Sequence, residues 1–218
     1  MSATRLYKLL PGLALLCCLS AYAQQLPQDV LEESGARLPY PTRGDLGEVG
    51  QPVADIFARG GPETPVTGPL AWASYNPAVG KALLDLHDGS VTRGSLDANI
   101  RELAILVASR ETDYTLEWNA HVRGATDVGI SAAAIEIVHD GKAVQGLSDE
   151  EAAVIQFGRE LLGEHRMGPD TFATAVELFG ERGTMDLVAV MMTYAVSGFY
   201  AIAVDEHPPG QTLLEPLR

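Results

Sequence analysis

Helix-start signals recur along the chain from Asn76 onward, and they constrain the fold more than any other feature of the sequence. Asparagine or serine, whose side chains cap helices by accepting a backbone hydrogen bond, stands before apolar residues at helical spacing. The capping residues are Asn76, Ser95, Ser131 and Ser148, the last in a capping box with Glu151. With proline and glycine boundaries they predict helices over residues 77–89, 96–111, 113 or 115 to 128, 132–139, 149–164, 169–178, and 181 or 184 to 204.

No stretch alternates between apolar and polar residues for long enough to predict a β-strand. The sequence therefore predicts an all-α bundle of six to seven helices in residues 71–208, followed by a C-terminal tail at 209–218. Residues 24–70 are rich in proline and glycine and predict an extended N-terminal arm, with at most a short helix near residues 53–59. We expect so long an arm to wrap the domain or a neighbouring subunit.

Residues 1–23 have the pattern of a signal peptide. Arg5 and Lys8 precede an apolar run over residues 9–19, and Ala21-Tyr22-Ala23 is a cleavage site of the A-x-A type. Cleavage after Ala23 would give a periplasmic or secreted protein; lipid attachment at Cys17 or Cys18 is the weaker interpretation, because the bulky Leu16 precedes them. The mature chain is expected to have no membrane span, since the apolar residues 187–204 include Thr193, Tyr194 and Ser197 and are typical of a core helix.

Charge and cysteine content exclude several function classes. The net charge of −14 repels nucleic acid and anionic membranes, so we expect neither as a partner. Cys17 and Cys18 are the only cysteines, and both lie in the predicted signal peptide. The mature chain would then have no thiol for redox chemistry and no disulfide, which leaves proton transfer as the chemistry of interest.

Glu117 and His121 are the candidate acid/base pair. They stand four residues apart in a predicted helix, so their side chains share one face, and Tyr114 lies one turn earlier on that face. Glu102, within the apolar run 100–107, is a second carboxylate that would complete a proton relay if it faced Glu117. The alternatives are a solvated Glu117–His121 pair and a surface Glu102 paired with Arg101 or Arg110.

Three further residues are candidates for substrate binding: Arg123, Trp118 and His139. Arg123 could hold a substrate carboxylate or simply be exposed. His139 ends a helix, where a positive charge also complements the helix dipole. We expect no metal and no cofactor, because the chain has no His-x-x-x-His or His-Glu-x-x-His motif and no cysteine ligand in the mature part.

Taken together, the motifs resemble the carboxymuconolactone decarboxylase / alkylhydroperoxidase-D-like (AhpD-like) family. The matching blocks, which span Arg37 to Pro208, are Arg37-Leu-Pro39, Asn76-Pro77-Ala78, Arg101-Glu-Leu-Ala-Ile-Leu106, Tyr114-x-x-Glu117-Trp-x-x-x-His121, Gly129-Ile-Ser131 and the final helix around Tyr194. The resemblance implies an all-α fold and a homo-oligomer, usually a trimer or hexamer. The family's peroxidase branch carries a Cys-x-x-Cys pair ahead of the histidine. Here Tyr114 and Glu117 occupy those positions, so the chain is similar to the cysteine-free, decarboxylase-like branch.

For the site, the resemblance implies a cofactor-independent lyase that removes CO₂ from a small γ-carboxy lactone. His121 with Glu117 would relay the proton, Glu102 would orient them, and Tyr114 or a backbone N–H would donate to the developing oxyanion. An isomerase acting on a lactone or carboxylate by the same acid/base chemistry is included in this expectation, and the export signal favours a substrate outside the archetypal cytoplasmic pathway. The alternative is a non-catalytic oligomeric binding protein that keeps the fold; the missing cysteines argue against a thiol peroxidase.

Overall fold

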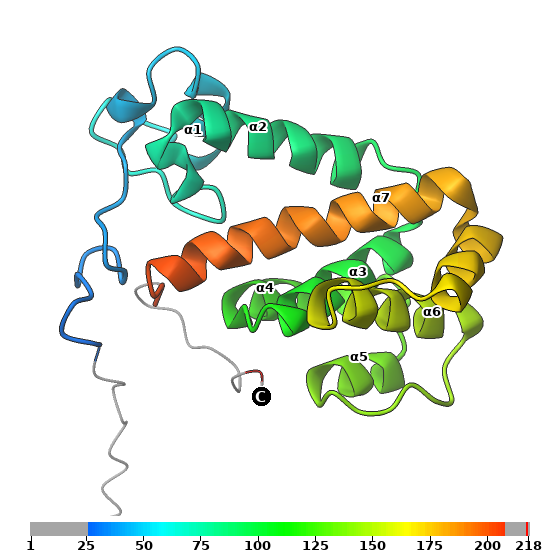
Figure 1. The fold of residues 1–218 in the computed structure, drawn as a ribbon. Helices are drawn as coiled ribbons and strands as arrows, with labels where there is room; N and C mark the ends of the chain where they lie inside the picture. The colour runs from blue at the N-terminus through cyan, green and yellow to red at the C-terminus, as the bar shows by residue number, and fades with distance from the viewer. Residues whose placement is uncertain (1–25, 208–216, 218) are drawn as a thin grey trace, which may run out of the picture.

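The computed structural model describes residues 26–207 and Leu217 (Figure 1). The predicted signal peptide, its cleavage site after Ala23 and nearly all of the predicted tail lie outside the described residues. Within them the chain forms α1 (Gln51–Phe57), α2 (Pro77–His87), α3 (Ala98–Glu111), α4 (Thr115–Ala125), α5 (Ala132–His139), α6 (Asp149–Gly158) and α7 (Pro169–Ala203). Apart from two isolated bridges in the arm, the described part has no β-pairing, and the predicted all-α class is confirmed.

Short helical turns complete the elements. The 3-10 turns η1 (Arg43–Leu46) and η2 (Ala73–Tyr75) lie in and after the arm, and the π-helical turns η3 (Asp88–Thr92) and η4 (Arg159–Gly163) extend α2 and α6. With η3, the helical segment that begins with α2 continues past its predicted end at residue 89. With η4, the segment that begins with α6 ends close to its predicted end at residue 164.

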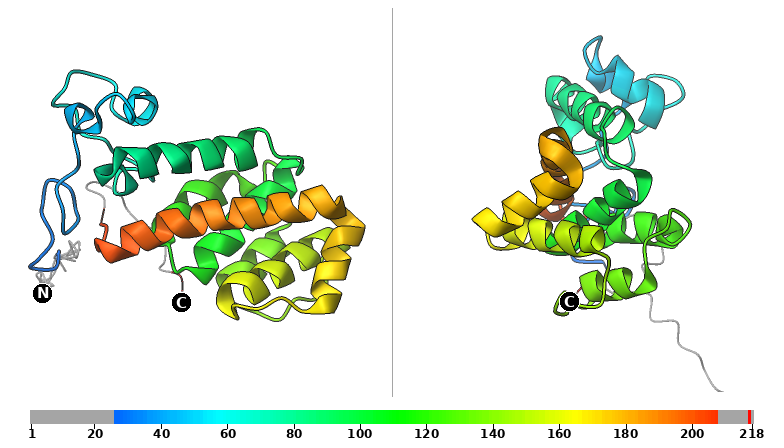
Figure 2. Two further views of the ribbon diagram at one scale, coloured as in Figure 1. Left: turned by 45° about the horizontal axis from the view of Figure 1, so that its top comes forward. Right: turned by 90° about the vertical axis from the view of Figure 1, so that its right-hand side faces the viewer.

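Helix α7 runs through the middle of the molecule, with α2 along one side and α3, α4 and α6 on the other (Figures 1 and 2). Its Leu187 and Met191 are completely buried and pack against α3 residues such as Leu103 and Leu106. By length and composition alone α7 could cross a membrane, but half of its most apolar stretch is buried in the domain. That burial is typical of the core helix of a globular domain.

Close approach of three helices depends on Gly158. A Cβ at this position would lie 2.3 Å from Cγ1 of Val107 and 2.9 Å from Cε of Met191, both closer than real Cβ contacts. Because Gly158 has no side chain, α6 packs directly against α3 and α7.

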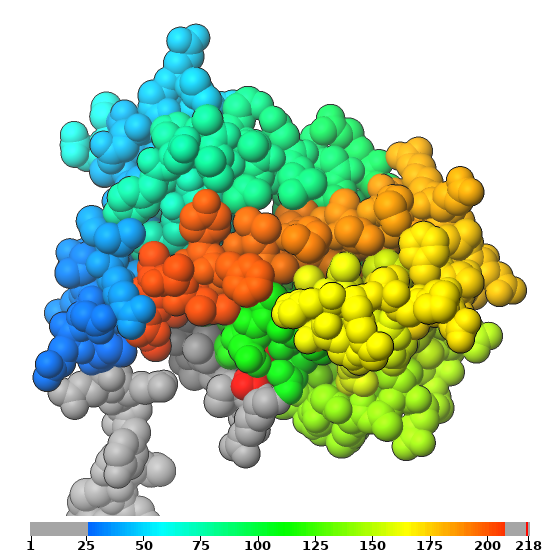
Figure 3. Space-filling view, viewed as in Figure 1, coloured from blue at the N-terminus to red at the C-terminus, as the bar shows by residue number. Residues whose placement is uncertain are grey.

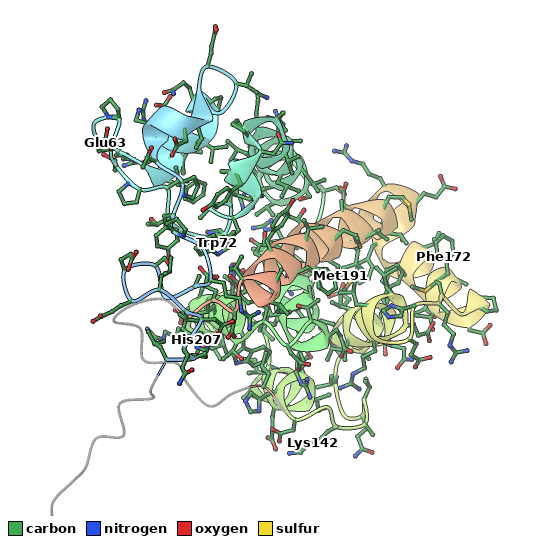
Figure 4. The ribbon with its side chains drawn as sticks, turned by 60° about the vertical axis from the view of Figure 1, so that its left-hand side comes forward. Glu63, Trp72, Lys142, Phe172, Met191 and His207 are labelled. Atoms are coloured by element: carbon green, nitrogen blue, oxygen red, sulfur yellow. The ribbon has the colours of Figure 1, made fainter. Side chains whose placement is uncertain are left out.

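The arm is more compact than the expected extended segment. Leu46, Val53, Val66 and Leu70 form a small hydrophobic cluster of their own, which packs against α2. The first part of the arm is attached to the end of α7, where the backbone N–H of Arg37 donates to the carbonyl of Val204. There Trp72, labelled in Figure 4, stacks on Tyr40 with ring centroids 4.8 Å apart.

Predicted helix starts agree with the structure wherever the cap is a local contact. Asn76, Ser131 and Ser148 each accept a backbone N–H of the first turn. The prediction for Ser95 is wrong: its amide and hydroxyl both donate to Asp186 on α7, and α3 begins only at Ala98. The two predicted final helices are both present: α7 consists of two helices that meet at a kink at Gly180, where φ is 70° and the backbone is not helical.

Candidate functional site

His121 lies between two carboxylates. Its Nδ1 is 2.6 Å from Oε1 of Glu102, and its Nε2 is 3.0 Å from Oε1 of Glu117. Glu117 and His121 meet because residues four apart in α4 share one face, whereas Glu102 reaches them from the adjacent helix α3. The structure therefore brings together the three residues that the sequence proposes for a relay.

The environment of this triad is largely screened from solvent. The side chains of Glu117, Glu102 and His121 are 10%, 20% and 23% exposed. Burial lowers the pKa of His121, but hydrogen bonds to Glu102 and Glu117 outweigh it and raise the pKa to about 9. The imidazole is thus an imidazolium at neutral pH, donating both of its N–H groups to carboxylates.

Glu117 and His121 of the triad line a cavity of about 630 Å³, which we call the His121 cavity. Four parts of the chain line it: the arm, α2 with η3, α4 and α7. The lining residues are Ile56, Phe57, Pro69, Leu70, Leu84, Asp85, His87, Asp88, Thr92, Glu117, His121, Thr193, Tyr194 and Ser197. Its size suits a small organic molecule, and its wall is mostly apolar with a few polar groups, as is usual for ligand pockets.

Tyr194 lines this cavity, and the sequence does not predict a role for it. Its ring meets the imidazole of His121 edge-on, with centroids 5.3 Å apart, and the residue is only 7% exposed. The hydroxyl has no hydrogen-bond partner within the described part of the chain. Burial, with the nearby charges of Glu117 and Glu102, raises the pKa of this phenol, so it remains a donor at the cavity wall.

Tyr114, the predicted oxyanion donor, points elsewhere. Its hydroxyl donates to Oε2 of Glu206 at 3.2 Å, and its ring lies against Gly198 on α7. It lines a second cavity of about 560 Å³, between the arm and α4, which shares Glu117 with the first. Tyr114 thus lies on the other side of Glu117 from the His121 cavity.

The three residues predicted to bind substrate line neither cavity. Trp118 is buried in the main core, with its ring 5.5 Å from that of His139. His139 pairs through Nδ1 with Asp140, which agrees with its alternative interpretation as a helix-end residue. Arg123 is exposed, which agrees with the alternative considered for it.

His87 closes the α2 side of the cavity. It ends α2, and its ring centroid lies 6.2 Å from that of Tyr194. From the sequence alone, a histidine at the end of a helix indicates only that its positive charge would complement the helix dipole. That His87 lines a cavity follows from the packing of α2 against α7. Across the described residues no group of three or more His, Cys, Asp or Glu side chains is arranged to hold a metal ion.

Comparisons with known proteins agree with this description. Residues 77–160 match the model of the carboxymuconolactone decarboxylase family, and this stretch contains His87, Glu102, Glu117 and His121. Among solved structures, a protein of unknown function from Agrobacterium tumefaciens, ATU0492, described as a candidate antioxidant defence protein AhpD, superposes with a TM-score of 0.51. The match is 15% identical and covers 64% of this chain and 97% of the other, which shows a shared fold. No curated protein matches this chain.

Proposed function

We propose that this chain, which belongs to the carboxymuconolactone decarboxylase family through residues 77–160, is a cofactor-independent acid/base enzyme acting on a small lactone or carboxylated substrate. The reaction would be a decarboxylation or an isomerisation. The observation that carries the proposal is the imidazolium of His121, held between Glu102 and Glu117 at the wall of a largely apolar cavity.

The hydrogen bonds of the triad suggest the path of the proton. Both nitrogens of His121 already donate to carboxylates, so a substrate carbon would receive its proton through Glu117, whose carboxylate takes the proton from His121 and passes it on. Glu102 holds the opposite nitrogen and fixes the orientation of the ring. Loss of CO₂ or of a proton leaves a dienolate, and the free hydroxyl of Tyr194 is placed to donate to its oxygen.

The alternative, a non-catalytic binding protein, predicts a solvated Glu117–His121 pair without a pocket. The mostly buried pair beside a cavity of about 630 Å³ favours the enzyme. Peroxide reduction by a thiol remains disfavoured, because Cys17 and Cys18 are the only cysteines of the chain.

The proposal is tested by following CO₂ release from a γ-carboxylated butenolide and double-bond migration in neutral butenolides. We expect Glu117→Gln to reduce whichever reaction occurs by about 100-fold or more, because Gln cannot pass on a proton. Glu136→Gln, on the exposed side of α5, is the matched control. Equal turnover by wild type and Glu117→Gln would remove the basis of the proposal.

We further propose that the protein is exported and forms a homo-oligomer. The signal-peptide pattern of residues 1–23 supports export. Exposed apolar side chains on α7 support assembly, and Figure 3 shows that the surface of this helix, drawn in orange, is not covered by other elements on that face. The exposed side chains are Met185, Met192, Phe199 and Ile202, spaced at seven, seven and three residues. Amino-terminal sequencing of exported protein should begin at Gln24, and Phe199→Ser should reduce the mass measured by light scattering.

A further inference from the structure

Two histidines from different helices contact the same tyrosine in the His121 cavity. His87 ends α2 and lies 6.2 Å from the Tyr194 ring, while His121, on α4, lies 5.3 Å from it. All three residues line the cavity. A ligand of a few carbon atoms placed over Tyr194 would therefore reach both imidazoles.

The two histidines differ in their hydrogen bonds. His121 has a carboxylate at each nitrogen, whereas neither ring nitrogen of His87 has a partner within the described part of the chain. Burial lowers the pKa of His87, although the charges of Glu117 and Asp88 act in the opposite direction. The surroundings thus favour a neutral imidazole at His87 and a protonated one at His121, the arrangement of a base and an acid in one site.

The charges at the cavity wall bear on the kind of ligand. Besides Glu117, the wall has two acidic residues, Asp85 and Asp88. Each pairs with a cation that does not line the cavity, Lys81 at 2.6 Å and Arg93 at 2.8 Å. No lysine or arginine is among the lining residues, and His121 is already paired with its own carboxylates. A substrate carboxylate would meet acidic groups without a cation to hold it, which is unfavourable in a screened site.

The rest of the wall combines three hydroxyl residues, Thr92, Thr193 and Ser197, with a larger apolar surface. Phe57 and Leu70 come from the arm and Leu84 from α2, so the arm supplies much of the surface that an apolar ring would contact. Moving a neutral ligand from water into such a site costs less free energy than moving a charged one.

We propose that His87 is the general base of the His121 cavity and that the substrate is a neutral, β,γ-unsaturated lactone or ketone, whose double bond moves by a 1,3-proton shift. This inference rests on the proposed function, because the Glu117–His121 relay supplies the acid. It selects isomerisation from the two reactions considered above and names the substrate class.

The steps balance without an oxidant, reductant or cofactor. The unprotonated ring nitrogen of His87 takes a proton from the α-carbon. The electron pair of that C–H bond enters the conjugated system, which gives a dienolate. The Tyr194 hydroxyl donates a hydrogen bond to the dienolate oxygen. The Glu117 carboxylate then takes a proton from His121 and passes it to the γ-carbon, and the double bond becomes conjugated with the carbonyl. The proton on His87 returns through solvent to His121, which restores the starting state.

The test follows α-angelica lactone, a neutral β,γ-unsaturated butenolide, by NMR in D₂O with the full-length mature protein. Two signals are measured: deuterium entry at the α-carbon, and formation of the conjugated isomer labelled at the γ-carbon. The variants are His87→Asn and Glu117→Gln, with His165→Asn as the matched histidine control, because His165 is exposed and does not line the cavity. Circular dichroism confirms that each variant is folded.

We expect His87→Asn to lower both signals by about 100-fold, since the first proton is no longer removed. Glu117→Gln should lower γ-labelled product while retaining most α-exchange. If His87→Asn isomerises the lactone like wild type while Glu117→Gln does not, His87 is not the base, although the proposed function stands. If wild-type protein leaves α-angelica lactone at the buffer rate but releases CO₂ from a γ-carboxylated butenolide, the neutral substrate class is wrong and the proposed function again stands.

Discussion

The ring of Tyr194 stands at 88° to the imidazole of His121, with the two centroids 5.3 Å apart. An edge-to-face contact of this kind fixes both rings and leaves the phenol hydroxyl at the cavity wall. Since this hydroxyl has no partner in the described part of the chain, it is preorganised to donate to a ligand.

Tyr194→Phe should therefore reduce isomerisation or decarboxylation by about 100-fold, with little change in stability, because only an unpaired hydroxyl is removed. Tyr114→Phe distinguishes this arrangement from the role expected from sequence. It removes the hydrogen bond to Glu206 outside the His121 cavity and should lower the rate much less. A larger loss of turnover in Tyr114→Phe than in Tyr194→Phe would contradict our assignment.

The pKa of His121 also predicts how stability depends on pH. The folded protein holds this proton up to about pH 9, while the unfolded chain releases it near 6.5, so folding binds a proton between these values. The stabilisation is complete below about pH 6.5 and is lost as the pH rises through about 9. It amounts to at most about 3 kcal/mol. Urea unfolding should show that the difference between wild type and His121→Gln shrinks over this window; a constant difference would contradict the shift.

Gly158 gives a prediction about the core. Gly158→Ala places a methyl group against Val107 and Met191, and should lower the free energy of unfolding by about 1–3 kcal/mol. Gly124→Ala, in α4 but with open space around its Cβ position, should be neutral or stabilising by up to about 1 kcal/mol. Urea unfolding at one pH compares the two; equal effects would mean that α6 does not pack as closely as described.

Local contacts explain which parts of the fold could be predicted from the sequence. Asn76, Ser131 and Ser148 cap helices through backbone groups two or three residues away, so their signals are read directly from neighbouring positions. Ser95 carries the same signal, but its hydroxyl bonds Asp186, 91 residues further along the chain. Whether Ser95 caps its own helix or bonds Asp186 depends on how α3 packs against α7.

The same distinction applies to the site. Glu117 and His121 are four residues apart in one helix, so their pairing follows from helical geometry. Tyr194 and His87 come from α7 and α2, and no spacing in the sequence indicates that their rings approach each other. Tyr114 was expected at the site because it shares a helical face with Glu117, but as the residue before α4 it turns toward Glu206 instead.

The most direct test of the account is an NMR titration of the His121 imidazole in the mature protein and in Glu117→Gln. We predict a midpoint near pH 9 in the wild type, because two carboxylates stabilise the imidazolium, and a clearly lower midpoint in Glu117→Gln, where one of them is neutral. A wild-type midpoint near 6.5 that does not move in the variant would contradict the coupled acid on which the proposed function depends.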